Sequence, residues 1–183
     1  MNSRKALKII EQRLKEGYSK KEVYEELFGQ VKFRMDLLQL LAMVPDYKDR
    51  IKYKKVNLIV FCLIVFVAVA KVIISPHFFL DTPFYMLPLA VFAALTWVFS
   101  LILVLNFKGF VYRYIGLFGS IGLISSILKF NEWSSYDATA WLSKLLLAWI
   151  PGILIIALSY YIGFKVFPYY GFWGRLQEKK LGL

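Results

Sequence analysis

The chain has little of what catalytic and metal sites are usually built from. It contains one cysteine, Cys62, and one histidine, His77, in 183 residues. One cysteine cannot form a disulfide within the chain, and one histidine cannot make a zinc site by itself. The H-E-x-x-H, G-x-S-x-G and C-x-x-C motifs are absent. We therefore expect a protein that is not an enzyme and that binds no metal and no cofactor.

Acidic side chains are also scarce, and none lies in a long apolar run. The chain has 12 Asp and Glu against 23 Lys and Arg, which gives a net charge of +11. A proton-coupled carrier usually places a carboxylate within a span, so the sequence does not favour that class. The positive charge would suggest nucleic acid in a soluble protein. Here the basic residues flank apolar segments, and membrane topology explains that arrangement more simply than nucleic-acid binding.

What the chain has in excess is apolar sequence. Hydrophobic residues make up 59% of it, above the 45–50% that is typical of soluble domains. A span needs about 20 residues of helix, and four runs come near or exceed this length. The third run is the weakest prediction, because Arg113 lies close to its start. The four predicted spans cover residues 58–74, 86–105, 110–128 and 145–167.

This pattern predicts an all-α, polytopic membrane protein built as a bundle of four transmembrane helices. We divide the chain into a basic helical segment (1–56), a transmembrane domain (57–168) and an aromatic, basic tail (169–183). The first fifty residues are polar, so the first span is expected to serve as its own insertion signal.

The distribution of Lys and Arg predicts the orientation of the spans. Residues 1–55 carry fourteen Lys and Arg, whereas 75–85 carry none. Lys108 lies between the second and third spans and Arg113 near the start of the third, and residues 130–143 again carry none. Positive residues stay on the cytoplasmic side. We therefore expect a multi-pass protein of the cell membrane with both termini in the cytoplasm.

The N-terminal segment is predicted to form short helices. Gly17 suits a C-terminal cap, and Ser19 with Glu22 forms a capping box that starts a second helix. A third helix ends before Pro45, and a further helix is expected to begin near Asp46 and to continue into the membrane. The apolar stripes of the first three helices are Leu7/Ile10/Leu14, Val23/Tyr24/Leu27/Phe28 and Leu37/Leu38/Leu41.

About fifty residues make a marginal core by themselves. The stripes are therefore expected to pack on each other, on the membrane surface or on another chain. Our hypothesis is that they dock a soluble cytoplasmic protein, with the helix from Asp46 linking that partner to the bilayer.

Two kinds of basic residue near the spans could have a function. The run before the first span could bind anionic membrane lipid or could only set the topology. Lys71, inside the first span, could extend its ammonium to the outer headgroups, pair with Asp81 or Glu132, or line a pore. The basic run consists of Lys48, Arg50, Lys52, Lys54 and Lys55.

The third and fourth spans contain features that affect helix packing. Small residues four apart let two helix backbones approach closely, either within this chain or between copies in a homo-oligomer. The residues concerned are Gly116, Gly119, Ser120, Gly122 and Ser126. In the fourth span, Pro151 and Gly152 are expected to break or bend the helix, because proline lacks a backbone donor.

The function that we infer from these features is a non-enzymatic membrane adaptor, sensor or immunity-type subunit with a partner on its N-terminal helices. The alternative is a homo-oligomeric channel or small transporter whose pore involves the third and fourth spans. A pore of that kind would use the glycine-serine face around Gly119 and the break at Pro151.

The orientation can be tested with single cysteines at Ser3 and Thr82 in a Cys62→Ser background. We expect an impermeant thiol reagent to label the two positions from opposite sides of a sealed vesicle, since fourteen positive residues precede the first span and none follows it directly. Labelling of both positions from the same side would contradict the four-span topology.

Overall fold

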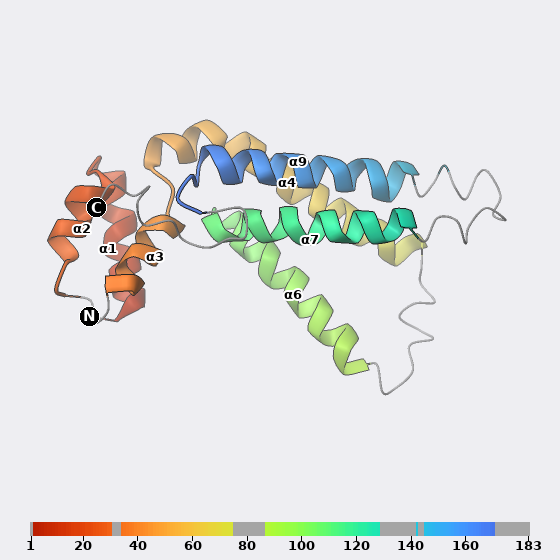
Figure 1. Cartoon of the computed structure of the whole chain (residues 1–183), viewed down its shortest axis with the longest axis horizontal. Coiled ribbons are helices and arrows are strands. Elements are labelled where there is room, and N and C mark those ends of the chain that lie inside the picture. The colour runs from red at the N-terminus through yellow and green to blue at the C-terminus, as the bar shows by residue number, and fades with distance from the viewer. Residues whose placement is uncertain (1, 31–33, 75–86, 129–141, 143–144, 171–183) are drawn as a thin grey trace.

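The computed structural model describes residues 2–30, 34–74, 87–128, 142 and 145–170, and every regular element in these ranges is helical. The predicted all-α class is confirmed. Figure 1 shows α1–α3 gathered at one end of an elongated molecule, α4, α7 and α9 running side by side, and α6 leaving them at an angle. The elements are α1 (Ser3–Lys15), α2 (Lys20–Leu27), α3 (Arg34–Met43), α4 (Tyr47–Ile74), α6 (Leu87–Leu105), α7 (Gly109–Leu128), the π-helical turn η3 (Leu145–Trp149) and α9 (Ile150–Lys165).

Local capping signals determine where the first helices end and begin. Gly17 has φ +96°, and the N–H groups of Gly17 and Tyr18 donate to the carbonyls of Leu14 and Arg13. These are the two bonds of a Schellman cap, which needs a residue in the left-handed region. The Ser19 side chain then accepts from the Glu22 N–H, and Glu22 accepts from the Ser19 N–H. The predicted capping box is confirmed.

The apolar stripes of α1, α2 and α3 pack against one another. Ile10, Val23 and Leu41 are fully buried, and Leu27 and Leu37 are nearly so. Of the three covers expected for these stripes, packing on each other is confirmed for most of the residues concerned, and docking of a partner stays a prediction. Three short helices bury their stripes because α3 lies across the other two and closes the cluster.

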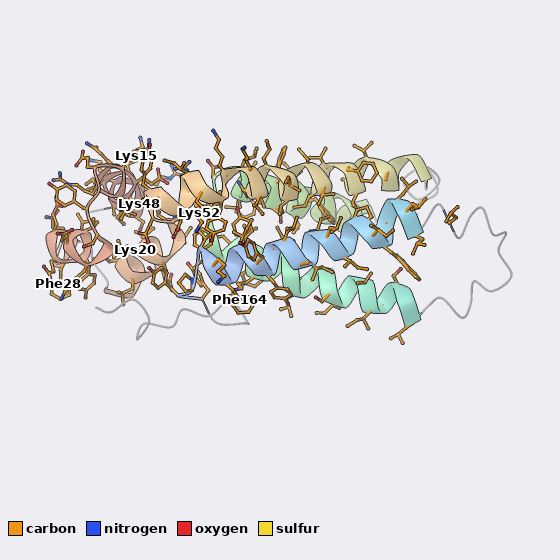
Figure 2. The ribbon with its side chains drawn as sticks, turned by 90° about the horizontal axis from the view of Figure 1, so that it is seen from above. Lys15, Lys20, Phe28, Lys48, Lys52 and Phe164 are labelled. Carbon is orange, nitrogen blue, oxygen red and sulfur yellow. The ribbon has the colours of Figure 1, made fainter. Side chains whose placement is uncertain are left out.

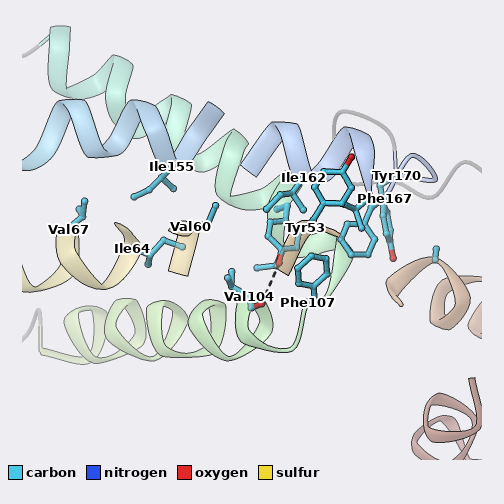
Figure 3. Packing of buried hydrophobic residues seen from close by; sticks show 14 of the residues in the cluster. Tyr53, Val60, Ile64, Val67, Val104, Phe107, Ile155, Ile162, Phe167 and Tyr170 are labelled. Atoms are coloured by element: carbon cyan, nitrogen blue, oxygen red, sulfur yellow. Dashed lines mark hydrogen bonds between the residues drawn. The ribbon is translucent and has the colours of Figure 1, made fainter. Parts of the chain in front are cut away.

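The predicted unbroken helix from Asp46 through residues 58–74 is confirmed as α4, the longest of the described elements. α4 has 28 residues, which corresponds to about 42 Å at 1.5 Å per residue. One face, with Tyr53, Val60 and Ile64, is buried against α9 and the neighbouring helices. Figure 3 shows Val60, Ile64 and Val67 of this face opposite Ile155 of α9.

Two apolar helical stretches, Tyr47–Ala70 and Leu145–Lys165, could span a membrane by their length and composition. In the described part of the chain, α6 contributes a shorter apolar stretch, Leu95–Leu105. The first and fourth predicted spans correspond to the two candidates, while spanning by α6 and α7 stays a prediction.

The small residues of α7 pack mainly within the chain. A Cβ built on Gly116 would lie 2.9 Å from the Tyr160 ring, and one on Gly119 would lie 2.9 Å from Ile156 Cγ1. Further along the same interface, Trp149 Nε1 donates to Ser126 Oγ over 3.0 Å. These contacts join α7 to α9 and the preceding turn η3.

Two other residues of the predicted packing face, Ser120 and Gly122, do not make such contacts with α9. Ser120 Oγ donates to the Gly116 carbonyl of its own helix over 2.7 Å, a bond that satisfies a hydroxyl in apolar surroundings. Gly122 is exposed, and a Cβ there would meet nothing within 4 Å among the described residues. The close approach of α7 to α9 therefore depends on Gly116 and Gly119.

The irregularity predicted at Pro151 and Gly152 lies slightly earlier in the chain. The π-helical turn η3 ends at Trp149, and Pro151 sits buried in the first turn of a regular α9. A π turn pairs each carbonyl with the N–H five residues ahead rather than four. It can therefore pass over a residue that has no N–H, and α9 itself continues unbroken to Lys165.

The α7–α9 packing predicts opposite results for two glycine substitutions. Gly119→Leu should lower the free energy of unfolding by about 1–3 kcal/mol or more, because the side chain would overlap Ile156. Gly122→Leu, the matched control, should leave it unchanged or raise it by up to about 1 kcal/mol through better helix propensity. Unfolding of the purified protein in detergent measures both, and equal destabilisation by the two variants would contradict the interface.

Candidate functional site at the junction of the N-terminal helices

The end of the long helices where α1–α3 meets them holds three of the four buried polar or charged side chains of the described residues, and we refer to it as the junction. One contact across it is an ion pair between Lys108, in the turn from α6 to α7, and Glu11 of α1, with Nζ 2.8 Å from Oε1. The Lys108 side chain is 12% exposed, so water screens this pair less than a surface pair. The same turn and α1 are 97 residues apart in sequence.

The turn that presents Lys108 has an unusual backbone. Phe107 has φ +55°, a left-handed conformation that glycine normally adopts. The Phe107 N–H donates to the Val104 carbonyl and the Lys108 N–H to the Leu103 carbonyl, which closes α6 with a Schellman cap. The phenyl ring offsets the strain because it is 3% exposed and packs against Tyr112 and Phe167, with centroids 5.9 and 6.0 Å away.

A second buried contact, which we call a polar tie because its hydrogen bonds connect helices, joins α4, α6 and α7. Asn57 Nδ2 donates to the Val104 carbonyl over 3.0 Å, and the Tyr112 hydroxyl donates to Asn57 Oδ1. The Tyr112 ring also stacks on Phe167, with centroids 5.7 Å apart. Figure 3 shows Val104 facing this cluster of aromatic rings, with a dashed hydrogen bond that ends at its carbonyl.

Arg113 supplies the third tie, and its side chain is only 1% exposed. Nη2 donates to the carbonyls of Gly163 and Tyr170 over 3.0 and 3.1 Å. The guanidinium also lies over the Phe164 ring, 3.6 Å from its centroid. The Gly163 carbonyl belongs to the last turn of α9, where carbonyls lack helical partners and favour a cation. The arginine that weakened the third-span prediction therefore caps the neighbouring helix.

Lys20 is the most unusual group in the junction. Its side chain is 6% exposed, and its ammonium lies 4.2 Å from the Tyr169 ring centroid, which is a cation–π contact. Nζ has no hydrogen-bond partner among the described residues. Burial lowers the pKa of Lys20 to about 8, although Asp46 and Asp49 counteract the shift. Sequence reasoning missed this residue, because a lysine in the first turn of a capped helix is normally solvated.

The site residues predicted from the sequence are not gathered in the junction. Lys48, Lys52, Lys54 and Lys55 of α4 are exposed, and Arg50 is partly buried. Lys71 has its backbone in α4, but its side chain lies outside the described residues, as do Asp81, Glu132 and His77. The residues that converge there instead are Glu11, Lys20, Asn57, Lys108, Tyr112, Arg113 and Tyr169.

The polar groups of the junction connect helices to one another. Two buried cations, Lys20 and Arg113, lie over aromatic rings, and each polar tie joins two or more helices. Within the described ranges, no group of three or more His, Cys, Asp or Glu side chains could hold a metal ion. Glu11 and Lys20 therefore join the N-terminal helices to the rest of the chain, while Asn57 and Arg113 join the long helices to one another.

Comparisons with known proteins give no relative. No protein-family model, no curated protein and no solved structure matches the chain.

The buried ammonium predicts a rise in stability with pH. Above pH 8 the folded chain releases the Lys20 proton, whereas the unfolded chain retains it up to about pH 10.5, so the free energy of unfolding increases across that range. The difference between the two pKa values corresponds to about 3 kcal/mol.

Lys20→Met should remove this slope and should stabilise the protein at pH 7 by about 1–3 kcal/mol, after subtraction of the lost cation–π contact. Denaturant unfolding at pH 7–9.5 measures the effect and avoids the titration of Tyr169. Exposed Lys21→Met is the control and should keep the slope of the parent. Parallel pH profiles for the parent and Lys20→Met would contradict the assignment.

Proposed function

We propose that this chain is an integral membrane protein of the cell membrane in which α4, α6, α7 and α9 form four spans and both termini lie in the cytoplasm. The Lys and Arg distribution supports the orientation. The two candidate helices support membrane insertion, because only 33% and 22% of their apolar windows are buried within the structure. The core helix of a soluble protein would be mostly covered. Membrane lipid would cover the exposed apolar faces.

Within this frame we propose a non-enzymatic role as an adaptor, sensor or immunity-type subunit that links the membrane to a soluble cytoplasmic partner. The observation that carries the proposal is the junction. A hinge would leave the N-terminal helices free to move. Here Glu11 pairs with Lys108 in the α6–α7 turn and Lys20 lies over Tyr169 just after α9. Leu38 and Ala42 of α3 belong to the buried cluster of the long helices. A displacement of α1–α3 would therefore act on the end of the long helices where these contacts lie.

The surface available to a partner differs from the one predicted from the sequence. Because the apolar stripes are buried, a partner has to use residues that the folded unit leaves exposed. Phe28 is 60% exposed at the end of α2 and lies beside Tyr24, with ring centroids 5.4 Å apart. Figure 2 shows Phe28 at the end of the molecule farthest from the long helices. Aromatic side chains of this kind are frequent anchors in interfaces.

The channel alternative has less support from the packing. A pore along the glycine-serine face would need open space between α7 and α9, but Tyr160 and Ile156 fill the positions beside Gly116 and Gly119. A homo-oligomer whose copies meet at other faces is still consistent with the exposed apolar surface, and it stays a prediction.

Photo-crosslinking in cells tests the adaptor proposal. Benzoylphenylalanine is placed at Phe28 and, as the matched control, at Phe66, an exposed aromatic position of α4. We expect one discrete adduct with a soluble protein from Phe28 and none from Phe66. An adduct of twice the chain mass would identify a second copy and contradict the adaptor role, as would the absence of any adduct from Phe28.

Substitution of an exposed residue tests partner binding better than deletion of the N-terminal helices. Removal of residues 1–44 would also delete Leu38 and Ala42, which belong to the same buried cluster as Val60 and Ile64 of α4. Phe28→Ala leaves that cluster intact. The protein identified in the Phe28 adduct should no longer co-purify with this variant. The midpoint of its unfolding in detergent should equal that of the parent.

A further inference from the structure

The first turns of α4 present three lysines in a row toward the outside of the molecule. Lys48, Lys52 and Lys55 are spaced four and three residues apart, which places them on one helical face, and all three are exposed. We call them the cationic strip. Figure 2 labels Lys48 and Lys52 on the first turns of α4, at the end that adjoins the N-terminal helices. The strip covers about 10 Å along the helix axis.

Two acidic residues, Asp46 and Asp49, lie close to the strip, and Asp49 is one helical turn before Lys52. Their charges act on Lys20 and Tyr169. Within the described residues, the ion pairs involve Arg13 and Lys108 and none involves the cationic strip. The strip therefore carries three lysines that have no ion-pair partner in the described part of the chain, and Lys52 Nζ lies 5.3 Å from the Tyr53 ring centroid.

The same helical face continues as an apolar ridge. Its members are all exposed and follow the cationic strip at helical spacing, and they are Leu58, Ile59, Cys62, Phe66 and Val69. From Leu58 to Val69 the ridge rises about 16 Å. This length is close to half of the roughly 30 Å hydrocarbon core of a bilayer, which is the depth of one leaflet.

We propose that this face of α4 is a binding site for an anionic phospholipid of the cytoplasmic leaflet. The cationic strip holds the phosphate of the headgroup, and an acyl chain lies along the apolar ridge. The site rests on the proposed membrane placement. In this proposal the basic run binds lipid as well as setting the topology, and three of its five residues make the lipid contact.

The remaining two basic residues of the run have different surroundings. Arg50 is partly buried and lines a shallow hollow with Lys15 of α1 and Tyr47. Lys54 lies at the edge of the strip rather than on its axis, one residue before Lys55. Substitution of Lys54 should therefore affect lipid binding less than substitution of Lys52.

Native mass spectrometry of the full chain tests the site. The purified protein is released from detergent after incubation with equal amounts of palmitoyl-oleoyl phosphatidylglycerol and palmitoyl-oleoyl phosphatidylcholine. We expect the parent to retain phosphatidylglycerol preferentially, and we expect K48Q/K52Q/K55Q to lower that binding at least tenfold. Because the measurement is made in detergent, a change of insertion orientation does not affect it.

The control is K5Q/K8Q/K21Q, which removes three exposed lysines from α1 and α2 and changes the net charge equally. It should bind phosphatidylglycerol as the parent does. Equal loss in both triple variants, or equal retention of the two lipids by the parent, would overturn the proposal. If K48Q/K52Q/K55Q does not fold, the single variant Lys52→Gln replaces it, with an expected loss of about fivefold against Lys54→Gln as its control.

Alkaline carbonate extraction of the parent separates this proposal from the one on which it rests. A chain that stays in the membrane fraction but shows no phosphatidylglycerol preference contradicts the lipid site alone. A chain that carbonate releases contradicts the membrane placement as well.

Discussion

The structure depends on hydrogen bonds that buried side chains make at one end of the long helices, where Arg113 bonds through Nη2 while its Nε and Nη1 have no partner among the described residues. Asn57 joins α4 to the last turn of α6 and to Tyr112 of α7, and Arg113 joins α7 to the last turn of α9. An unpaired amide or guanidinium at these positions would cost several kcal/mol in a medium of low polarity. The helices are therefore held in one register at this end, and the aromatic rings of Phe107 and Phe167 pack around the ties.

This constraint explains why the two ends of the long helices differ. α7 and α9 stay together along their length because Gly116 and Gly119 admit the side chains of α9 and because Trp149 reaches Ser126. α6 has neighbours mainly where Asn57 and the Schellman-capped turn hold it, and beyond that region it diverges (Figure 1). Its exposed apolar residues, such as Leu95 and Phe99, are the expected surface for lipid or for another protein.

The junction also determines what the N-terminal helices can do. Their apolar stripes are used internally, and the unit is attached through Glu11, Lys20 and α3. An attached unit transmits a load better than a flexible module, and the proposed adaptor or sensor role rests on this attachment. The charges of Asp46 and Asp49 act on Lys20 in the junction, whereas the three lysines of the cationic strip are exposed.

The sequence by itself determined the features that depend on neighbours along the chain. The cap at Gly17, the capping box at Ser19 and the unbroken helix from Asp46 follow from residues a few positions apart, and apolar run length indicated α4 and α9 as candidate spans. Only the tertiary structure decided that Arg113 caps α9, that Lys20 is buried over Tyr169, and that Gly119 but not Gly122 packs against α9. These outcomes depend on residues 37 to 149 positions away in sequence, and no local pattern records which side chain a folded helix will meet.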